Sequence, residues 1–199
     1  VTSKGLPIAG VTARDAIHDM CTFSTRNCAD PESPSGFREI AYRPGQKRLS
    51  RYAQLMRDGM NGEVPNSLRI ARHSERVVIR FRRILESCRP GVRLNDDDRR
   101  AFDLRKHRTV PMCAKRPAHT LTTLPDDLIH YSQPRILTVR ECARLQSFPD
   151  WFEFRGKYTT GGDRRKHECP RYTQIGNAVP PLLAEAWGTA LHALLQELP

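Results

Sequence analysis

The sequence predicts a mixed α/β fold in which helical segments at both ends of the chain flank a loop-rich middle. Capped helices near each end, and a long central run interrupted by glycine and proline, support this prediction. Amphipathic helices bury an apolar stripe, whereas glycine and proline interrupt regular structure. With 199 residues, 38% of them hydrophobic, the chain has room for one domain or two small ones with a modest core.

The first predicted helix covers residues 11–20. Thr12 is suited to the N-cap position, and Ala13, Ile17 and Met20 then fall on one face. This stretch therefore predicts a short helix packed on one side.

Residues 21–62 show little periodicity and many breakers, so we expect irregular structure with one short helix around residues 49–57. Residues 68–85 then place apolar side chains at helical spacing with arginines between them, which predicts a helix with an arginine-rich face. That face is either a solvated flank or a surface that contacts phosphates. In the second case Arg80 and Arg83 are candidate nucleic-acid contacts.

Asn95 and the three aspartates after it predict the cap of another short helix, which runs through Phe102 and Leu104. Alternating threonine and leucine predict an edge strand over residues 116–123, and Pro125-Asp126-Asp127 predicts a turn after it. The glycine-containing, basic segment over residues 156–171 is either a clamp on a phosphate backbone or a disordered connector.

The most regular signals lie between residues 136 and 181. Thr138 precedes Glu141 by the spacing of a capping box, so we expect a helix over residues 139–146. Gly176-Asn177 predicts a tight turn whose backbone can approach a ligand closely, and Pro180-Pro181 starts a final helix. That helix carries a wide apolar stripe, which must pack against another surface.

Composition indicates the kind of partner. Thirty-three Lys and Arg residues against 22 Asp and Glu give a net charge of +11, which favours a polyanion, although a basic but inert surface is the alternative. The six cysteines lack zinc-site spacing, so no metal is expected. No apolar run suits a membrane span or a signal peptide, so we expect a cytoplasmic protein with no membrane partner. A chain starting at Val1 suggests a fragment or an alternative start codon.

Four segments resemble parts of the cytosine-5 DNA methyltransferases. T-V-R-E-C-A-R-L-Q-S-F-P-D, from Thr138, resembles the ninth motif of that family, and Q-I-G-N-A-V-P-P, from Gln174, resembles the tenth. T-A-R-D-A-I-H-D-M, from Thr12, resembles the segment that follows the eighth motif. P-A-H-T-L, from Pro117, resembles a short element of the target-recognition region.

The resemblance implies a C-terminal remnant of a Rossmann-like, S-adenosylmethionine-dependent methyltransferase domain with a loop-rich, mixed α+β target-recognition domain. Residues 1–20 would end the catalytic-domain segment, residues 21–135 would form the target-recognition domain, and residues 136–199 would hold motifs nine and ten. The final helix would pack on the catalytic domain. Left exposed, it would lead either to self-association through that face or to partial disorder.

The resemblance also assigns roles to individual residues. Asn177, Ala178 and Val179 would contact S-adenosylmethionine. Three residues of the ninth motif would brace the recognition region through a buried Arg–Glu pair: Arg140, Glu141 and Arg144. The candidate contacts to double-stranded DNA are Arg116, Thr120, Thr122, Arg80 and Arg83, and arginines within residues 21–115 would read bases.

The family's chemistry needs a Pro-Cys motif, a Glu-Asn-Val motif and a glycine-rich turn, and none of them occurs in this chain. We therefore expect no catalytic residue here, no activity of the chain alone, and a catalytic subunit or segment as partner. The predicted role is DNA recognition in a bacterial, nucleoid-associated restriction-modification enzyme. The alternatives are a fragment of an RNA-directed relative and a non-catalytic DNA-binding module.

Overall fold

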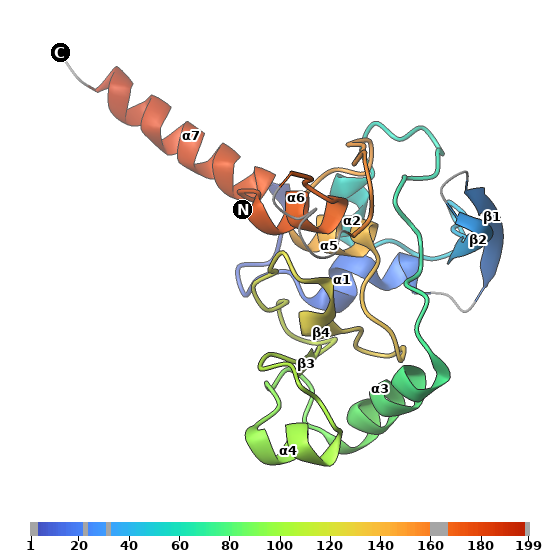
Figure 1. Cartoon of the computed structure of the whole chain (residues 1–199). Coiled ribbons are helices and arrows are strands. Elements are labelled where there is room, and N and C mark those ends of the chain that lie inside the picture. The colour runs from blue at the N-terminus through green and yellow to red at the C-terminus, as the bar shows by residue number, and fades with distance from the viewer. Residues whose placement is uncertain (1–3, 22–23, 31–32, 160–166, 198–199) are drawn as a thin grey trace.

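The computed structural model describes residues 4–21, 24–30, 33–159 and 167–197, and its elements are arranged as Figure 1 shows. The helices are α1 (Ala13–Ile17), α2 (Arg51–Met56), α3 (Glu75–Ser87), α4 (Asp96–Ala101), α5 (Val139–Leu145), α6 (Arg171–Asn177) and α7 (Pro181–Gln196). The strands are β1 (Thr25–Asp30), β2 (Ser33–Ile40), β3 (Val110–Pro111) and β4 (Leu128–Ile129), and 3₁₀ turns lie at His18–Met20 and Pro125–Asp127. None of the helices within these ranges is long and apolar enough to cross a membrane.

Polar side chains start four of the helices, and the sequence predicts three of these caps, those at Thr12, Asn95 and Thr138. Thr12, Asn95 and Thr138 form complete capping boxes at α1, α4 and α5, and Ser50 caps α2 by accepting from the Ala53 amide. Each cap satisfies an amide that has no partner inside its helix, which typically contributes about 1 kcal/mol. The predicted final helix also begins at Pro181, in the first-turn position that proline favours.

The main core lies where α1, α2, α5 and α6 meet. Ile17, Met20, Val139 and Ala143 are fully buried there, and Ile175 from α6 closes the cluster. A buried aliphatic side chain of this size contributes roughly 1.5–3 kcal/mol. The core therefore holds together two helices from opposite ends of the sequence, α1 and α5.

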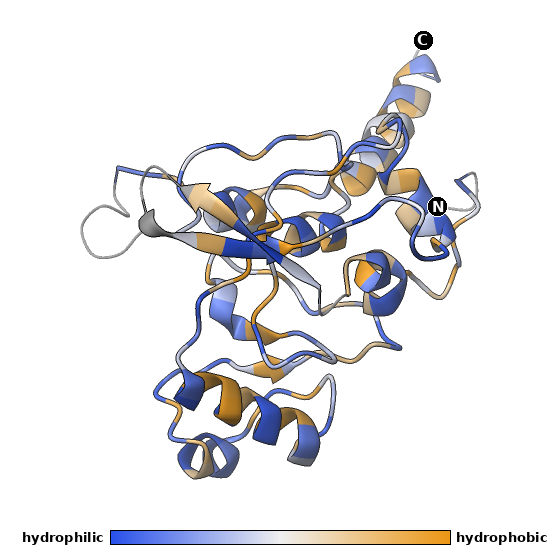
Figure 2. Cartoon of the chain, turned by 90° about the vertical axis from the view of Figure 1, so that its right-hand side faces the viewer, coloured by the Kyte–Doolittle hydropathy of each residue, from blue (hydrophilic) through white to orange (hydrophobic). Residues whose placement is uncertain are grey.

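A second, smaller cluster joins α3 and α4. Phe81 and Ile84 of α3 are buried against Leu94 and Phe102, and the cluster reaches the main body through Ile129. Figure 2 shows the alternation of hydrophobic and hydrophilic residues on α3 that this one-sided burial requires. The predicted helix over residues 68–85 is correct in its second half only.

Two short sheets are present in the described residues. β1 and β2 pair antiparallel, with an irregularity between Cys28 and Asp30, whereas β3 and β4 pair in parallel. A Cβ at Gly36 would lie 2.6 Å from the Cys28 carbonyl oxygen, and Gly36 has a φ of +61°, so only glycine fits at this position. The described part of the chain thus has mixed α/β composition but contains no Rossmann-like parallel sheet.

The hairpin corrects the prediction of irregular structure over residues 21–62. Residues 68–70 extend it, because the Ile40 amide donates to the Leu68 carbonyl at 3.1 Å and the Ile70 amide donates to the Arg38 carbonyl at 2.8 Å. This pairing also keeps residues 68–70 out of a helix, so α3 starts later than the apolar spacing predicts.

The predicted edge strand over residues 116–123 is wrong. Among the residues that the structure describes, no strand pairs with that segment and its backbone is irregular, whereas the predicted turn at Pro125–Asp127 is confirmed as a 3₁₀ turn. Alternation of side chains describes an extended backbone but does not supply the neighbouring strand that a sheet needs.

Candidate cofactor loop and nucleic-acid interface

A buried ion pair at the start of α5 joins Glu141 to Arg135. The Arg135 guanidinium donates to both carboxylate oxygens at 2.7 Å, and the Thr138 amide donates to the same carboxylate at 2.7 Å. Burial alone would raise the pKa of Glu141, but the charge and hydrogen bonds of Arg135 lower it to about 2. The buried Arg–Glu pair expected in the ninth motif therefore exists, but its arginine is Arg135, which the sequence did not single out.

Arg140 of α5 bonds mainly to backbone. Its guanidinium donates to the carbonyl oxygens of Asn66, Pro149 and Phe152 at 3.0, 3.2 and 2.6 Å, and to the Asn66 side chain at 2.7 Å. One fully buried side chain thus fixes two loops against α5.

Arg144, also fully buried, is bound by two carboxylates. It donates to Asp150 at 2.6 and 2.7 Å and to Asp19 at 3.2 and 3.1 Å. Tyr42 donates to Asp19 at 2.8 Å, and Arg57 pairs with Asp150 at 3.3 Å. The network ties the end of the α1 segment to α5, although Asp19 and Arg144 are separated by 125 positions in the sequence.

His130 lies beside the Arg135–Glu141 pair and is completely buried. Its Nδ1 accepts from the amides of Ser132 and Gln133 at 3.1 and 3.2 Å, so Nδ1 carries no proton. Burial lowers the pKa of His130 to about 4, with Glu141 opposing the shift and Arg135 adding to it. His130 is therefore neutral near pH 7.

The predicted cofactor residues lie between α6 and α7. Asn177 ends α6 and is exposed, Ala178 packs partly against the core, and Val179 is 64% exposed. The side chain of Gln146 donates to the Ile175 carbonyl at 3.3 Å, so α5 supports this segment. The three residues form an open edge rather than an enclosed site.

Gly176 is not in the tight turn that the sequence predicts, because it lies inside α6. A Cβ at this position would come within 2.5 Å of the Thr122 carbonyl oxygen and 2.6 Å of the Thr123 amide nitrogen. The absence of a side chain at Gly176 therefore admits the backbone of the 120–123 segment, not a ligand.

The candidate DNA contacts fall into two groups. Arg116 and Thr120 are exposed on the segment that reaches Gly176, whereas the Thr122 hydroxyl donates to Asp127 at 2.7 Å. Arg80 pairs with Asp103 at 3.4 Å and Arg83 lies over the Phe102 ring at 5.6 Å, so both arginines serve the contact between α3 and α4.

Sequence reasoning missed Arg108, the arginine bound to Thr120. Its guanidinium donates to the Thr120 carbonyl at 2.8 Å and lies 3.9 Å from the Asp127 carboxylate. Of the basic 156–171 segment, Lys157 pairs with Glu168 at 3.0 Å, while Arg164, Arg165 and Lys166 lie outside the described residues.

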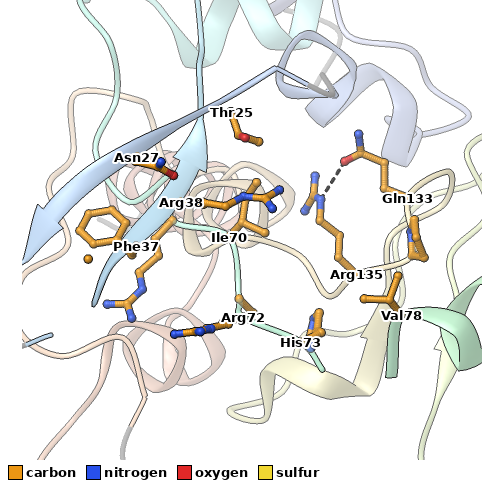
Figure 3. Close-up of a pocket in the computed structure, with 14 residues that line it drawn as sticks. Thr25, Asn27, Phe37, Arg38, Ile70, Arg72, His73, Val78, Gln133 and Arg135 are labelled. Carbon is orange, nitrogen blue, oxygen red and sulfur yellow. Dashed lines mark hydrogen bonds between the residues drawn. The ribbon is translucent and has the colours of Figure 1, made fainter. Parts of the chain in front are cut away.

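A cleft of about 760 Å³ lies between the hairpin and residues 69–73. Figure 3 shows arginine and amide side chains around it, with aromatic and aliphatic residues between them. Its charged and polar lining residues are Thr25, Asn27, Arg38, Arg69, Arg72, His73, Gln133 and Arg135. The cleft thus offers hydrogen-bond donors and positive charge, which suits a nucleic-acid strand.

The side chains of the 177–179 loop could contact a nucleoside-type cofactor on one side only. The described residues offer no set of ligands for a metal ion. The Asn177 amide can donate and accept, and Val179 offers apolar contact, yet a small-molecule site normally encloses most of its ligand. No group of three or more His, Cys, Asp or Glu within the described residues could hold a metal ion.

Comparison with known proteins identifies relatives of the chain. The family model described as C-5 cytosine-specific DNA methylase matches residues 37–193. The chain is 38% identical over 127 residues to type II methyltransferase M.DdeI of Desulfomicrobium norvegicum, covering 58% of this chain and 29% of that protein. It is 47% identical over 74 residues to type II methyltransferase M.AquIB of Picosynechococcus sp., covering 36% of this chain and 52% of that protein.

Among solved structures, a DNA modification methyltransferase encoded within an E. coli prophage matches with a TM-score of 0.55 and 23% identity. The match covers 98% of this chain and 53% of that chain, and shows a likeness of fold. The part matched by this chain makes up 14% of the length of the curated relative M.XorII and 52% of the length of M.AquIB. Because the family model covers well over half of the sequence, the chain belongs to the C-5 cytosine-specific DNA methylase family.

Proposed function

We propose that this chain supplies DNA recognition and one edge of the S-adenosylmethionine site in a DNA cytosine-5 methyltransferase whose catalytic cysteine lies on another segment or subunit. The observation that carries this proposal is the position of α7. Figure 1 shows α7 projecting from the body, directly after the loop of Asn177 and Val179. A surface that covered α7 would therefore also close the open edge of that loop.

The apolar side of α7 requires such a surface. None of its described residues is buried, and Trp187 is 62% exposed. The other large apolar side chains exposed on this helix are Leu183, Leu191, Leu194 and Leu195. A contiguous exposed stripe of this kind marks an interaction site. We infer that the catalytic segment occupies it, and self-association through α7 is the competing arrangement.

The base of α7 is fixed, which gives the stripe a defined direction. The Leu182 amide donates to the Ser147 hydroxyl at 3.0 Å, and Lys4 pairs with Glu185 at 2.8 Å. The start of α7 is thereby held against the end of α5. A partner on α7 would then lie in a fixed position relative to the recognition region.

S-adenosylmethionine, when bound, supplies the electrophilic methyl group of the reaction. The chain's own part would be to hold it: Asn177 through its amide and Val179 through apolar contact. The Arg140 and Arg144 networks would keep that loop in register with the DNA-facing segment around Thr120. The missing Pro-Cys and glycine-rich motifs would come from the partner.

The length of one relative supports a divided enzyme. The 74 residues matched in M.AquIB make up 52% of it, so a protein curated as a type II methyltransferase is itself shorter than this chain. One type II methyltransferase chain can therefore be shorter than the 199 residues of this chain.

A methyl-transfer assay on duplex DNA with labelled S-adenosylmethionine tests the proposal. The chain would be assayed alone and with a protein that carries the missing motifs. We expect transfer only in the mixture, reduced roughly fivefold by Asn177→Ala, since a lost hydrogen bond costs about 1 kcal/mol. Transfer by the chain alone, or none in any mixture despite DNA binding, would contradict the proposal. The second result would favour a non-catalytic DNA-binding module.

The RNA-directed alternative is tested by competition. Duplex DNA and structured RNA of equal length would compete for the labelled chain. We expect the DNA to displace the probe at lower concentration, and the opposite order would favour an RNA substrate.

A further inference from the structure

We propose that the β1–β2 hairpin reads base edges in the DNA major groove through Asn27 and Arg38, which makes these two residues determinants of sequence specificity. The inference rests on the proposed function, because it assumes that DNA is the ligand. It assigns base reading to one element within the recognition region.

The register of the hairpin brings the two side chains together. Asn27 is the cross-strand partner of Arg38, so both project from the same face of the ribbon. Thr25, two residues from Asn27, lies on that face as well, and all three line the cleft (Figure 3). The opposite face carries Arg26, which pairs with Glu39 at 2.5 Å.

The two side chains have no role in holding the fold. Asn27 and Arg38 are both exposed, and within the described part of the chain neither side chain has a hydrogen-bond or ion-pair partner. Other arginines of the cleft are engaged: Arg135 by Glu141, and Arg69 by the rings of Phe37 and Tyr158 at 4.9 and 5.1 Å. The base-reading capacity of the cleft therefore falls on the hairpin.

The charge of the cleft selects an anionic partner. Four of its 14 lining residues are arginines, and none of the 14 is an aspartate or glutamate. Arg72 lies across the cleft from the hairpin and adds positive charge there (Figure 3). Phosphates of one DNA strand would be attracted into this space, with the hairpin alongside their bases.

The chemistry of the two side chains matches base edges. Arginine can donate two parallel hydrogen bonds to guanine, asparagine can do the same with adenine through one donor and one acceptor, and a two-stranded ribbon fits the major groove. Figure 1 places β1 and β2 on the side of the molecule away from α7. DNA on the hairpin would therefore leave α7 free for the partner.

Selection from a randomised duplex pool tests the inference with the full chain and four variants. Asn27→Ala and Arg38→Ala should each relax one position of the enriched sequence, with a loss of discrimination of roughly 5- to 150-fold at that position. Arg38→Lys should relax the same position as Arg38→Ala, since lysine keeps the charge but loses the planar fork. Arg155→Ala, which removes an exposed arginine outside residues 21–115, is the matched control and should leave the enriched sequence unchanged.

The outcomes separate this inference from the proposed function. An unchanged motif in Asn27→Ala and Arg38→Ala would overturn it, whether binding is normal or uniformly weaker, because a uniform loss identifies a phosphate contact. If the unmodified chain bound DNA but enriched no sequence, the base-reading inference would be overturned too. The DNA-binding part of the proposed function would still stand. Failure of the unmodified chain to retain DNA would overturn the proposed function as well.

Discussion

Gly176 shows how one missing side chain sets the distance between two functional segments. Its backbone lies against Thr122 so closely that a Cβ would overlap the peptide of residues 122–123. The helix that ends at Asn177 and the segment that carries Thr120 are therefore locked together. A shift of either one would move the proposed cofactor edge relative to Thr120, the proposed DNA contact.

Replacement of Gly176 by alanine should destabilise the chain by about 1–3 kcal/mol, the usual cost of overpacking. Urea denaturation measures the change. Gly188→Ala is the matched control, because a Cβ there meets nothing within 4 Å and alanine favours a helix. Equal behaviour of the two variants would show that the contact with Thr122 is not restrictive.

His130 should make stability depend on pH. Its folded pKa of about 4 lies below the ordinary value of 6.5, so the unfolded chain binds a proton between these two values that the folded chain does not. The free energy of unfolding should therefore fall as pH falls from about 6.5 to 4. Above pH 6.5 this contribution is fully present.

His130→Asn removes the titration while an amide oxygen can still accept from the Ser132 and Gln133 amides. We expect a smaller loss of stability between pH 7 and pH 4.5 in this variant, measured by urea unfolding at both values. His192→Asn, on the exposed α7, is the control. A pH profile identical to that of the unmodified chain would contradict the assignment.

At the scale of the element, α5 is stabilised by ions rather than by apolar packing alone. It presents three fully buried charged side chains, and each has several partners. Buried pairs are expensive to break, since removal of one partner leaves the other charge without compensation.

Glu141→Ala should therefore cost about 3–5 kcal/mol, because it leaves Arg135 buried without its carboxylate. Glu153→Ala removes an exposed glutamate that pairs with Arg155, and should change stability by less than about 0.5 kcal/mol. Thermal unfolding of the two variants makes the comparison. Similar losses would mean that the buried pair contributes no more than a surface pair.

The sequence predicted the local features of these elements and missed the long-range ones. The caps of α1, α4 and α5 were predictable because each is formed within four residues. The β1–β2 hairpin was missed because much of it is exposed and polar, which leaves little hydrophobic alternation to detect. The apolar spacing of residues 68–70 predicts a helix, but these residues pair with β2 instead, and that long-range pairing overrides the local pattern.

The candidate cofactor loop and DNA-facing residues were likewise predictable only in their local features. The ninth-motif residues were identified, but their partners Asp19 and Arg135 depend on the folded arrangement. The roles of Asn177, Ala178 and Val179 as cofactor contacts, and of Arg116 and Thr120 as DNA contacts, stay predictions. The cleft could not be predicted, since it is bounded by segments from three separate parts of the chain.

At the scale of the whole molecule, the surfaces proposed for DNA recognition and for the catalytic partner lie on different sides. The hairpin and its basic cleft lie on one side, and α7 projects from another (Figure 1). A change on α7 should therefore affect assembly without affecting DNA binding.

Leu191→Glu on the apolar stripe should leave the free energy of unfolding within about 0.5 kcal/mol, because Leu191 is 55% exposed. It should abolish methyl transfer in the reconstituted mixture, since a charge on the stripe disfavours a covering surface. Thr189→Gln, two residues from Trp187 and thus on the opposite side of the helix, is the matched control. Full activity of Leu191→Glu in the mixture would remove α7 from the interface.

Because α7 projects from the body, its exposure also affects the fraction of molecules in which this helix is ordered. A helix of 16 residues whose contacts with the body are confined to its first turns is only marginally stable in water beyond them, so the order of its later turns depends on what binds it. By mass action, the ordered fraction of α7 would then rise and fall with the concentration of the covering segment. Molecules produced in excess over that segment would keep frayed, apolar ends accessible to proteases, so degradation would adjust the two components to equal amounts.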